Sequence, residues 1–173
     1  MERYLALLRG VNVGGRHKLP MAELRALLES RGYTGVCTLI QSGNVCFTPP
    51  PGAAADEGEL AALLSERFGF EIPVLLCPGA EWEGILAANP FPDETEHVYV
   101  LLLGRTPDAQ AVARCAALPR GADDFRVVGR TVYLLLRAGV TSSALDIPRL
   151  ERALGTRGTV RNWATACKLR ALL

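Results

Sequence analysis

The stretch LLRGVNVGGRHKLP, residues 7–20, combines glycines with basic side chains and is the part of the sequence best suited to bind an anion. Glycines let backbone N–H groups face a ligand, and arginine and lysine add positive charge. An asparagine in the same stretch adds an amide. Phosphate binding is the chemistry that this pattern suggests, and its candidate ligand-binding residues are Arg9, Asn12, Gly14, Gly15 and Lys18.

The same stretch does not match the known phosphate loops. Gly10 and Gly15 have the spacing of the GxxxxGK[ST] motif, but Arg16 and His17 follow in place of the lysine and the hydroxyl residue. The GxGxxG dinucleotide pattern is also absent. Two interpretations stay open: a less specialised anion site, or a tight strand-to-helix connector in which glycine allows a positive φ.

A second polar motif, QSGN, lies between two apolar runs. Gln41, Ser42 and Asn44 could offer amide and hydroxyl groups to a ligand. Serine, glycine and asparagine are equally ordinary in a hairpin turn. We expect this turn and the loop after the first strand to lie at opposite ends of their sheet, which disfavours a single site.

A third motif, TVRNWATACKLR, gathers basic residues around a tryptophan. Arg161, Asn162, Trp163 and Lys168 could stack on a base or hold a phosphate. In the alternative interpretation, Asn162 caps the last helix and Trp163 packs that helix onto the core.

Signals for catalysis and for metal binding are weak. His17 and His97 are the only histidines, and neither lies in a known nucleophile motif. The acidic run at residues 93–96 suggests a solvated loop, and a weakly bound cation is the alternative interpretation. The five cysteines include no CxxC pair, which argues against a zinc site and a disulfide framework and favours a reducing compartment. The sequence predicts no metal site and no cofactor.

The composition is that of a globular chain with segregated charge. Of the 173 residues 49% are hydrophobic, and the net charge is only +1. Residues 1–48 hold six Lys/Arg and three Asp/Glu, residues 49–148 hold seven and fourteen, and residues 149–173 hold six and one. No run has the length of a signal peptide core or a membrane span. We expect a cytoplasmic protein that does not bind membranes.

Apolar periodicity and turn residues predict two successive βαββαβ units. The first has strands at Tyr4–Leu8, Val36–Ile40, Val45–Thr48 and Ile72–Cys77, a helix that starts at Pro20 and ends at Gly32, a loop at Pro49–Gly58 and a helix at Glu59–Phe68. The second has a linking helix at Glu81–Ala88, strands at Val98–Leu103, Phe125–Val128, Thr131–Leu136 and Thr159–Arg161, and helices at Pro107–Leu118 and Pro148–Leu154. A helix after Asn162 ends the pattern.

The predicted fold class is therefore α+β, with two tandem ferredoxin-like units, antiparallel sheets, a linking helix and a C-terminal helix. The predicted domains are residues 1–78 and 79–173.

The motifs LLRGVNVGG, LPMAELRALLES, IQSGNV, NPF and RNW occur in an order that resembles the bacterial family called domain of unknown function 1697. The resemblance spans Tyr4 to Leu169 and implies a two-part α+β fold, with no assigned reaction. His17 and Ala164 replace asparagines that are common in the family, and Val160 replaces a threonine. If the family site uses those side chains, this member binds its ligand differently or more weakly.

The sequence is compatible with three functions. The leading one is binding of a nucleotide or of a nucleic-acid phosphate backbone through the glycine-rich loop. The second is an enzyme that acts on a phosphorylated metabolite, with Arg9, Lys18 or His17 positioning it. The third is an interaction module without a ligand. Under any of the three, the protein is a monomer or a homodimer.

Overall fold

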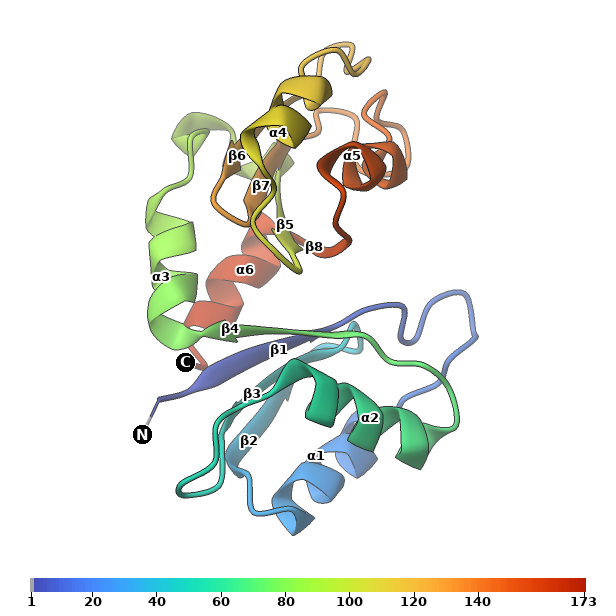
Figure 1. Ribbon diagram of the computed structural model, residues 1–173, viewed down its shortest axis with the longest axis vertical. Helices are drawn as coiled ribbons and strands as arrows, with labels where there is room; N and C mark the ends of the chain where they lie inside the picture. The colour runs from blue at the N-terminus through green and yellow to red at the C-terminus, as the bar shows by residue number, and fades with distance from the viewer. Residues whose placement is uncertain (1) are drawn as a thin grey trace. The chain divides into compact units, whose positions relative to one another are not determined.

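A computed structural model describes residues 2–173, which form two compact units. The first unit contains the residues up to Gly84 together with Lys168–Leu173, and the second contains Ile85–Cys167. The units divide within the helix that connects them, between Gly84 and Ile85, and within the last helix, between Cys167 and Lys168. Each unit has four strands and is α+β, as Figure 1 shows.

The first unit follows the order β-α-β-β-α-β. Its elements are β1 (Tyr4–Leu8), α1 (Met21–Ser30), β2 (Thr34–Leu39), β3 (Asn44–Thr48), α2 (Glu57–Phe68) and β4 (Val74–Pro78), followed by α3 (Gly79–Ala87). Its sheet has the order β2-β3-β1-β4, and every neighbouring pair is antiparallel.

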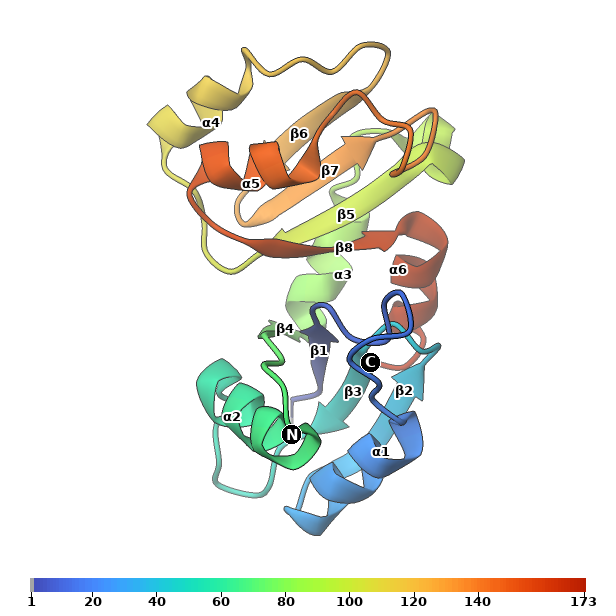
Figure 2. The same cartoon turned by 90° about the vertical axis from the view of Figure 1, so that its right-hand side faces the viewer.

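The helices α1 and α2 cover one face of this sheet, and Figure 2 shows them side by side. Leu24 and Leu28 are the buried stripe of α1, and Leu60 and Leu64 are that of α2. Their spacing of four residues places each pair on one side of a helix, where it packs on the sheet. The same core includes Ala6, Leu8, Val45, Phe47, Val74 and Leu76 from the strands.

Several boundaries of the first unit differ from the sequence prediction, among them β2, which starts two residues earlier than predicted and ends one residue earlier. The segment Pro49–Gly58 was predicted as a loop, but α2 already begins at Glu57. Asp56 caps this helix by accepting a hydrogen bond from the Glu59 N–H (2.8 Å). Strand β4 starts at Val74, two residues later than predicted.

The second unit repeats the order after a short 3₁₀ helix. Its elements are η1 (Pro92–His97), β5 (Val98–Leu103), α4 (Ala109–Cys115), β6 (Asp124–Val128), β7 (Thr131–Leu135), α5 (Ile147–Leu154), β8 (Gly158–Asn162) and α6 (Trp163–Arg170). The sheet has the order β6-β7-β5-β8, again antiparallel throughout. The helix η1 occupies the acidic run that was predicted as a loop, and α4 is shorter at both ends than predicted.

The core of the second unit is separate. Leu101 and Leu103 of β5 pack with Val132 and Leu134 of β7, and Leu150 of α5 covers them.

None of the helices within residues 2–173 has the length and the apolar character that a membrane span requires.

Candidate functional site

Three loops of the first unit meet at one end of its sheet: the β1–α1 loop (residues 9–20), the β2–β3 turn (40–43) and the α2–β4 loop (69–73). The Leu8 N–H donates to the Gly43 carbonyl (2.8 Å), and the Arg9 N–H donates to the Pro73 carbonyl (3.0 Å). Figure 2 shows the dark blue β1–α1 loop beside the end of β2. We call this region the loop end.

The expectation that the first two of these loops lie at opposite ends is wrong. Strand β3 is antiparallel to both β1 and β2, so β1 and β2 point the same way. The residues that follow β1 and the residues that follow β2 must then emerge at the same edge of the sheet.

The side chain of Asn12 locks the β1–α1 loop. Its Oδ1 accepts from the Leu19 N–H (2.8 Å), and its Nδ2 donates to the carbonyls of Leu19 (3.1 Å) and Gln41 (2.7 Å). Leu19 is buried, so the two bonds to Leu19 satisfy backbone groups of a residue that has almost no contact with water. This predicted ligand-binding amide is therefore part of the scaffold that joins two loops.

Above the Asn12 lock, the chain makes a small exposed turn. The Arg16 N–H donates to the Val13 carbonyl, and the Asn12 N–H donates to the His17 carbonyl, both at 3.0 Å. Gly14 and Gly15 form the tip with φ values of +58° and +74°. A Cβ atom at either glycine would meet nothing within 4 Å, so both lie in open space.

The cations of the turn face solvent. Residues 9–20 contain three Lys/Arg and no Asp/Glu. Within residues 2–173 no carboxylate lies within ion-pair distance of Arg16 or Lys18, and both residues are exposed. Arg9 is half-buried at the base of the loop. His17 stacks on Phe70 of the α2–β4 loop, with ring centroids 4.7 Å apart.

The predicted residues of the β2–β3 turn have mainly structural contacts. Asn44 is fully buried, and its Nδ2 donates to the Leu39 carbonyl (3.0 Å) and to the Ser42 Oγ (2.9 Å). Gln41 is exposed and contributes its backbone carbonyl to Asn12. Gly43 has a tight environment, since a Cβ there would lie 2.7 Å from atoms of Leu8 and Val11.

The loop end also holds unusual backbone conformations. Asn12 (φ +54°), His17 (φ +52°) and Ile40 (φ +51°) are the non-glycine residues with positive φ among residues 2–173. A β-branched residue is disfavoured there, and Ile40 is also 56% exposed. Val13 is 66% exposed. Strain of this kind persists where the surroundings impose it, and it concentrates at functional sites.

The predicted residues at positions 161–163 belong to the second unit. Arg161 is buried, which lowers its pKa to about 10, and it donates to the Thr159 Oγ1 and the Val160 carbonyl, both at 2.8 Å. Asn162 accepts from the Thr165 N–H (2.8 Å), which confirms its predicted role as the cap of α6. Trp163 is half-buried, and Lys168, in the part of α6 assigned to the first unit, is exposed.

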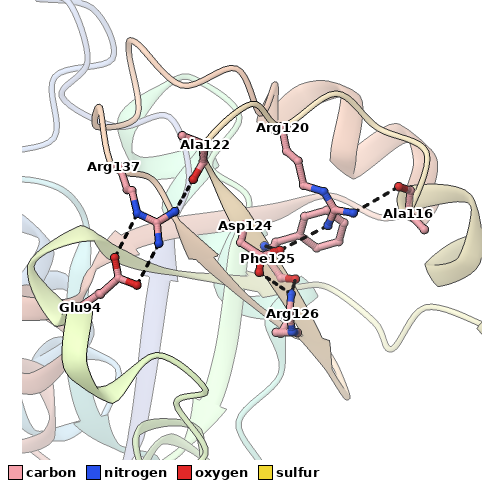
Figure 3. Close-up of polar contacts among 8 residues, drawn as sticks. All are labelled: Glu94, Ala116, Arg120, Ala122, Asp124, Phe125, Arg126 and Arg137. Carbon is pink, nitrogen blue, oxygen red and sulfur yellow. Dashed lines mark hydrogen bonds and ion pairs between the residues drawn. The ribbon is translucent and has the colours of Figure 1, made fainter.

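The second unit contains an arginine-lined hollow that the sequence did not reveal. Figure 3 shows the polar contacts of the arginines that line it. The volume of the hollow is about 480 Å³. Glu94 binds Arg137 through two hydrogen bonds, from Nε (3.1 Å) and from the Nη2 nitrogen (2.9 Å). Asp124 pairs with Arg126 (2.7 Å) and with Arg120 (3.3 Å). The lining residues are Arg120, Gly121, Asp123, Asp124, Arg126 and Arg137.

Carboxylates neutralise this hollow from within. Burial acts to raise the pKa of Asp124, but hydrogen bonds from Arg126 and from the Phe125 N–H outweigh it, so the pKa is lowered. Asp123 accepts from the Arg137 N–H (2.9 Å) and the Ser143 hydroxyl (2.6 Å). Three arginines thus face three acids, which makes the hollow a weaker anion site than the loop end. The arginines come from separate elements within an acidic stretch, so no local motif marks them.

No cluster of three or more histidine, cysteine, aspartate or glutamate side chains within residues 2–173 could hold a metal ion. Of the acidic run, Glu94 binds Arg137, and Glu96 lies 3.5 Å from His97.

Comparisons with known proteins agree with this architecture. The chain is similar to a solved structure, the conserved bacterial protein SP0830 from Streptococcus pneumoniae, with a TM-score of 0.73 and 24% identity over 99% of this chain and 98% of that one. No curated protein sequence matches significantly. The model of one family, described as protein of unknown function (DUF1697), matches residues 1–133, which include the whole loop end. The chain belongs to the DUF1697 family.

Proposed function

We propose that this protein binds the phosphate groups of a nucleotide or a nucleic-acid backbone at the loop end of its first unit. One observation carries the proposal: Arg16 and Lys18 are exposed on a fixed turn and have no carboxylate partner among the described residues. In the arginine-lined hollow of the second unit, by contrast, the arginines are paired with acids.

The turn offers both kinds of group that a phosphate needs. The N–H groups of Gly14 and Gly15 donate to no other described residue, and their positive φ values turn the backbone outward at the tip. Successive N–H groups in such turns form concavities that bind anions, and nearby cations strengthen the attraction. The Asn12 lock holds these donors in place before a ligand arrives, so binding has less ordering entropy to overcome.

The structural contacts divide the residues of the loop end into two groups, and Arg16 joins the residues predicted from the sequence. We assign Arg9, Gly14, Gly15, Arg16 and Lys18 to phosphate contact, with Gln41 at the edge. Asn12, Ser42 and Asn44 act as the scaffold. Arg161, Asn162, Trp163 and Lys168 are not part of this proposal, because buried hydrogen bonds and capping account for Arg161 and Asn162.

We also propose that each unit is a ferredoxin-like fold. The order β-α-β-β-α-β, the strand order 2-3-1-4 and the placement of both helices on one face support this assignment. Five cysteine thiols without disulfides support a cytoplasmic location.

The test is a titration of the full-length protein with a fluorescent single-stranded oligonucleotide and with a nucleoside triphosphate, each at two salt concentrations. We expect affinity to fall with salt. The double substitution Arg16→Ala with Lys18→Ala should reduce the slope of log K against log salt by about 1.4 for the single strand, since each phosphate contact contributes about 0.7.

Arg31→Ala is the matched control. Arg31 is exposed at the other end of α1, about 15 Å along the helix. It should leave both the affinity and the slope unchanged. Binding that is absent, that is insensitive to salt, or that weakens equally in the Arg31 variant would refute the proposal.

A further inference from the structure

Two cysteines of the first unit face each other across neighbouring strands. Cys37 of β2 and Cys46 of β3 are direct register partners in an antiparallel pair, so their side chains project from the same face of the sheet. Directly opposed residues have Cα atoms about 4.5–5.5 Å apart. A disulfide requires about 4.4–6.8 Å, so the backbone already has the separation that an S–S bond needs.

The two thiols differ in access. Cys46 lies on an inner strand and is fully buried. Cys37 is half-buried on β2, which is one of the two edge strands of the sheet. Burial and the neighbouring Cys37 raise the pKa of Cys46 to about 12, so Cys46 stays protonated at neutral pH. A small oxidant in solution can therefore reach and react with Cys37 first.

A cation stands beside the accessible thiol. The Arg3 guanidinium donates to the Cys37 Sγ (3.6 Å) and to the Gly35 carbonyl (3.1 Å). The thiolate is the nucleophilic form of cysteine, and the Arg3 guanidinium places a positive charge next to the Cys37 sulfur. The same guanidinium can also stabilise an anionic sulfur–oxygen group formed at Cys37.

We propose that Cys37 and Cys46 are a peroxide-oxidisable pair that closes to a disulfide between β2 and β3. In the first step, the Cys37 thiolate attacks one peroxide oxygen, the O–O bond breaks and hydroxide leaves, which gives a sulfenic acid. In the second step, the Cys46 sulfur attacks the Cys37 sulfur, its proton passes to the departing hydroxyl and water leaves. Two thiols and one hydrogen peroxide become one disulfide and two waters.

The local structure can accommodate this bond. The register of β2 against β3 shifts between Thr34 and Cys37, so the edge strand is irregular just before the reacting residue. The bond would close the hairpin that carries residues 40–43. The pair stands independently of the phosphate-binding proposal, because Arg3, Cys37 and Cys46 are not part of the loop end.

The experiment treats the full-length protein with hydrogen peroxide, blocks remaining thiols by alkylation and maps tryptic peptides by mass. No lysine or arginine lies between Arg31 and Arg67, so residues 32–67 form one peptide that contains both cysteines and no other. We expect this peptide to lose the mass of two hydrogen atoms and to resist alkylation until a reductant is added.

Three variants sharpen the result. Cys37→Ser should abolish the mass loss, and Cys46→Ser should leave a sulfenic acid at Cys37 that dimedone traps. Cys167→Ser, at an exposed cysteine outside the pair, should behave like the parent. The proposal is overturned if both thiols of peptide 32–67 stay open to alkylation while Cys167 is oxidised. It is also overturned if Cys37 in the parent accumulates oxygen without linking to Cys46. The parent protein alone gives a decisive result, even if a buried substitution impairs folding.

Discussion

Replacing Asn12 by alanine tests whether the loop end is held by one side chain. Asn12→Ala removes the three hydrogen bonds to Leu19 and Gln41 and leaves the buried Leu19 backbone groups without those partners. Each bond contributes about 1 kcal/mol. Alanine also tolerates the φ of +54° less well than asparagine does, at about 1 kcal/mol. We expect the free energy of unfolding of the first unit to fall by about 3–4 kcal/mol.

Urea unfolding of the full-length chain measures this change, and hydrogen–deuterium exchange of the β1 and β3 amides assigns it to the first unit. Asn12→Gly separates the two contributions, because it loses the hydrogen bonds but accepts the positive φ. It should recover about 1 kcal/mol relative to alanine. Gln41→Ala is the control, since only the backbone carbonyl of Gln41 takes part, and it should change stability by about 0.5 kcal/mol or less.

An Asn12→Ala protein that unfolds at the parent's urea concentration would refute the lock. So would a Gln41→Ala protein that is destabilised as strongly. In either case the loop would owe its conformation to glycine turns and to main-chain bonds alone.

Two further substitutions test packing and charge. Gly43→Ala places a Cβ 2.7 Å from atoms of Leu8 and Val11 at a φ of +76°, so it should lower the free energy of unfolding, measured with urea, by more than about 2 kcal/mol. Gly14→Ala lies in open space and should lower it by about 1 kcal/mol, through the positive φ alone. Equal losses in the two variants would contradict the packing argument. Asp124 has a lowered pKa, so its charged form stabilises the fold above the ordinary carboxyl pKa and this contribution is lost as the pH falls through its lowered value. Asp124→Asn should therefore lose about 1 kcal/mol at neutral pH, and the difference in stability from the parent should shrink as the pH falls below the ordinary carboxyl pKa. A difference that stays constant with pH would speak against the ion pair.

The strands were the most predictable part of the fold. The limits of β1 and β5 match the prediction, because each is a short apolar run that ends at a polar or glycine residue. The start of α2 was missed, although Asp56 and Glu59 have the spacing of a helix cap, because Gly58 and the preceding alanines and prolines resemble a loop.

The contacts of the candidate site were less predictable. The role of Asn12 depends on a carbonyl 29 residues away in the sequence, and no local pattern indicates that bond. The prediction that the loops after β1 and β2 lie at opposite ends of the sheet was wrong because these two strands run in the same direction. Strand direction fixes the edge of the sheet at which each loop emerges. The positive charge that Arg16 and Lys18 give the loop could be predicted from the sequence, since an exposed charge in a glycine-rich turn needs no distant partner.

The first unit is completed by residues that come after the second. Lys168–Leu173 belong to it, and Arg170 pairs with Glu83 there at 2.9 Å. The second unit is thus an insertion within the first. Domains generally fold as they leave the ribosome, N-terminal ones first. Here the first unit cannot complete its fold until residues 168–173 have been synthesised. The residues of the second unit are all synthesised earlier, so the second unit can fold completely before the first unit does.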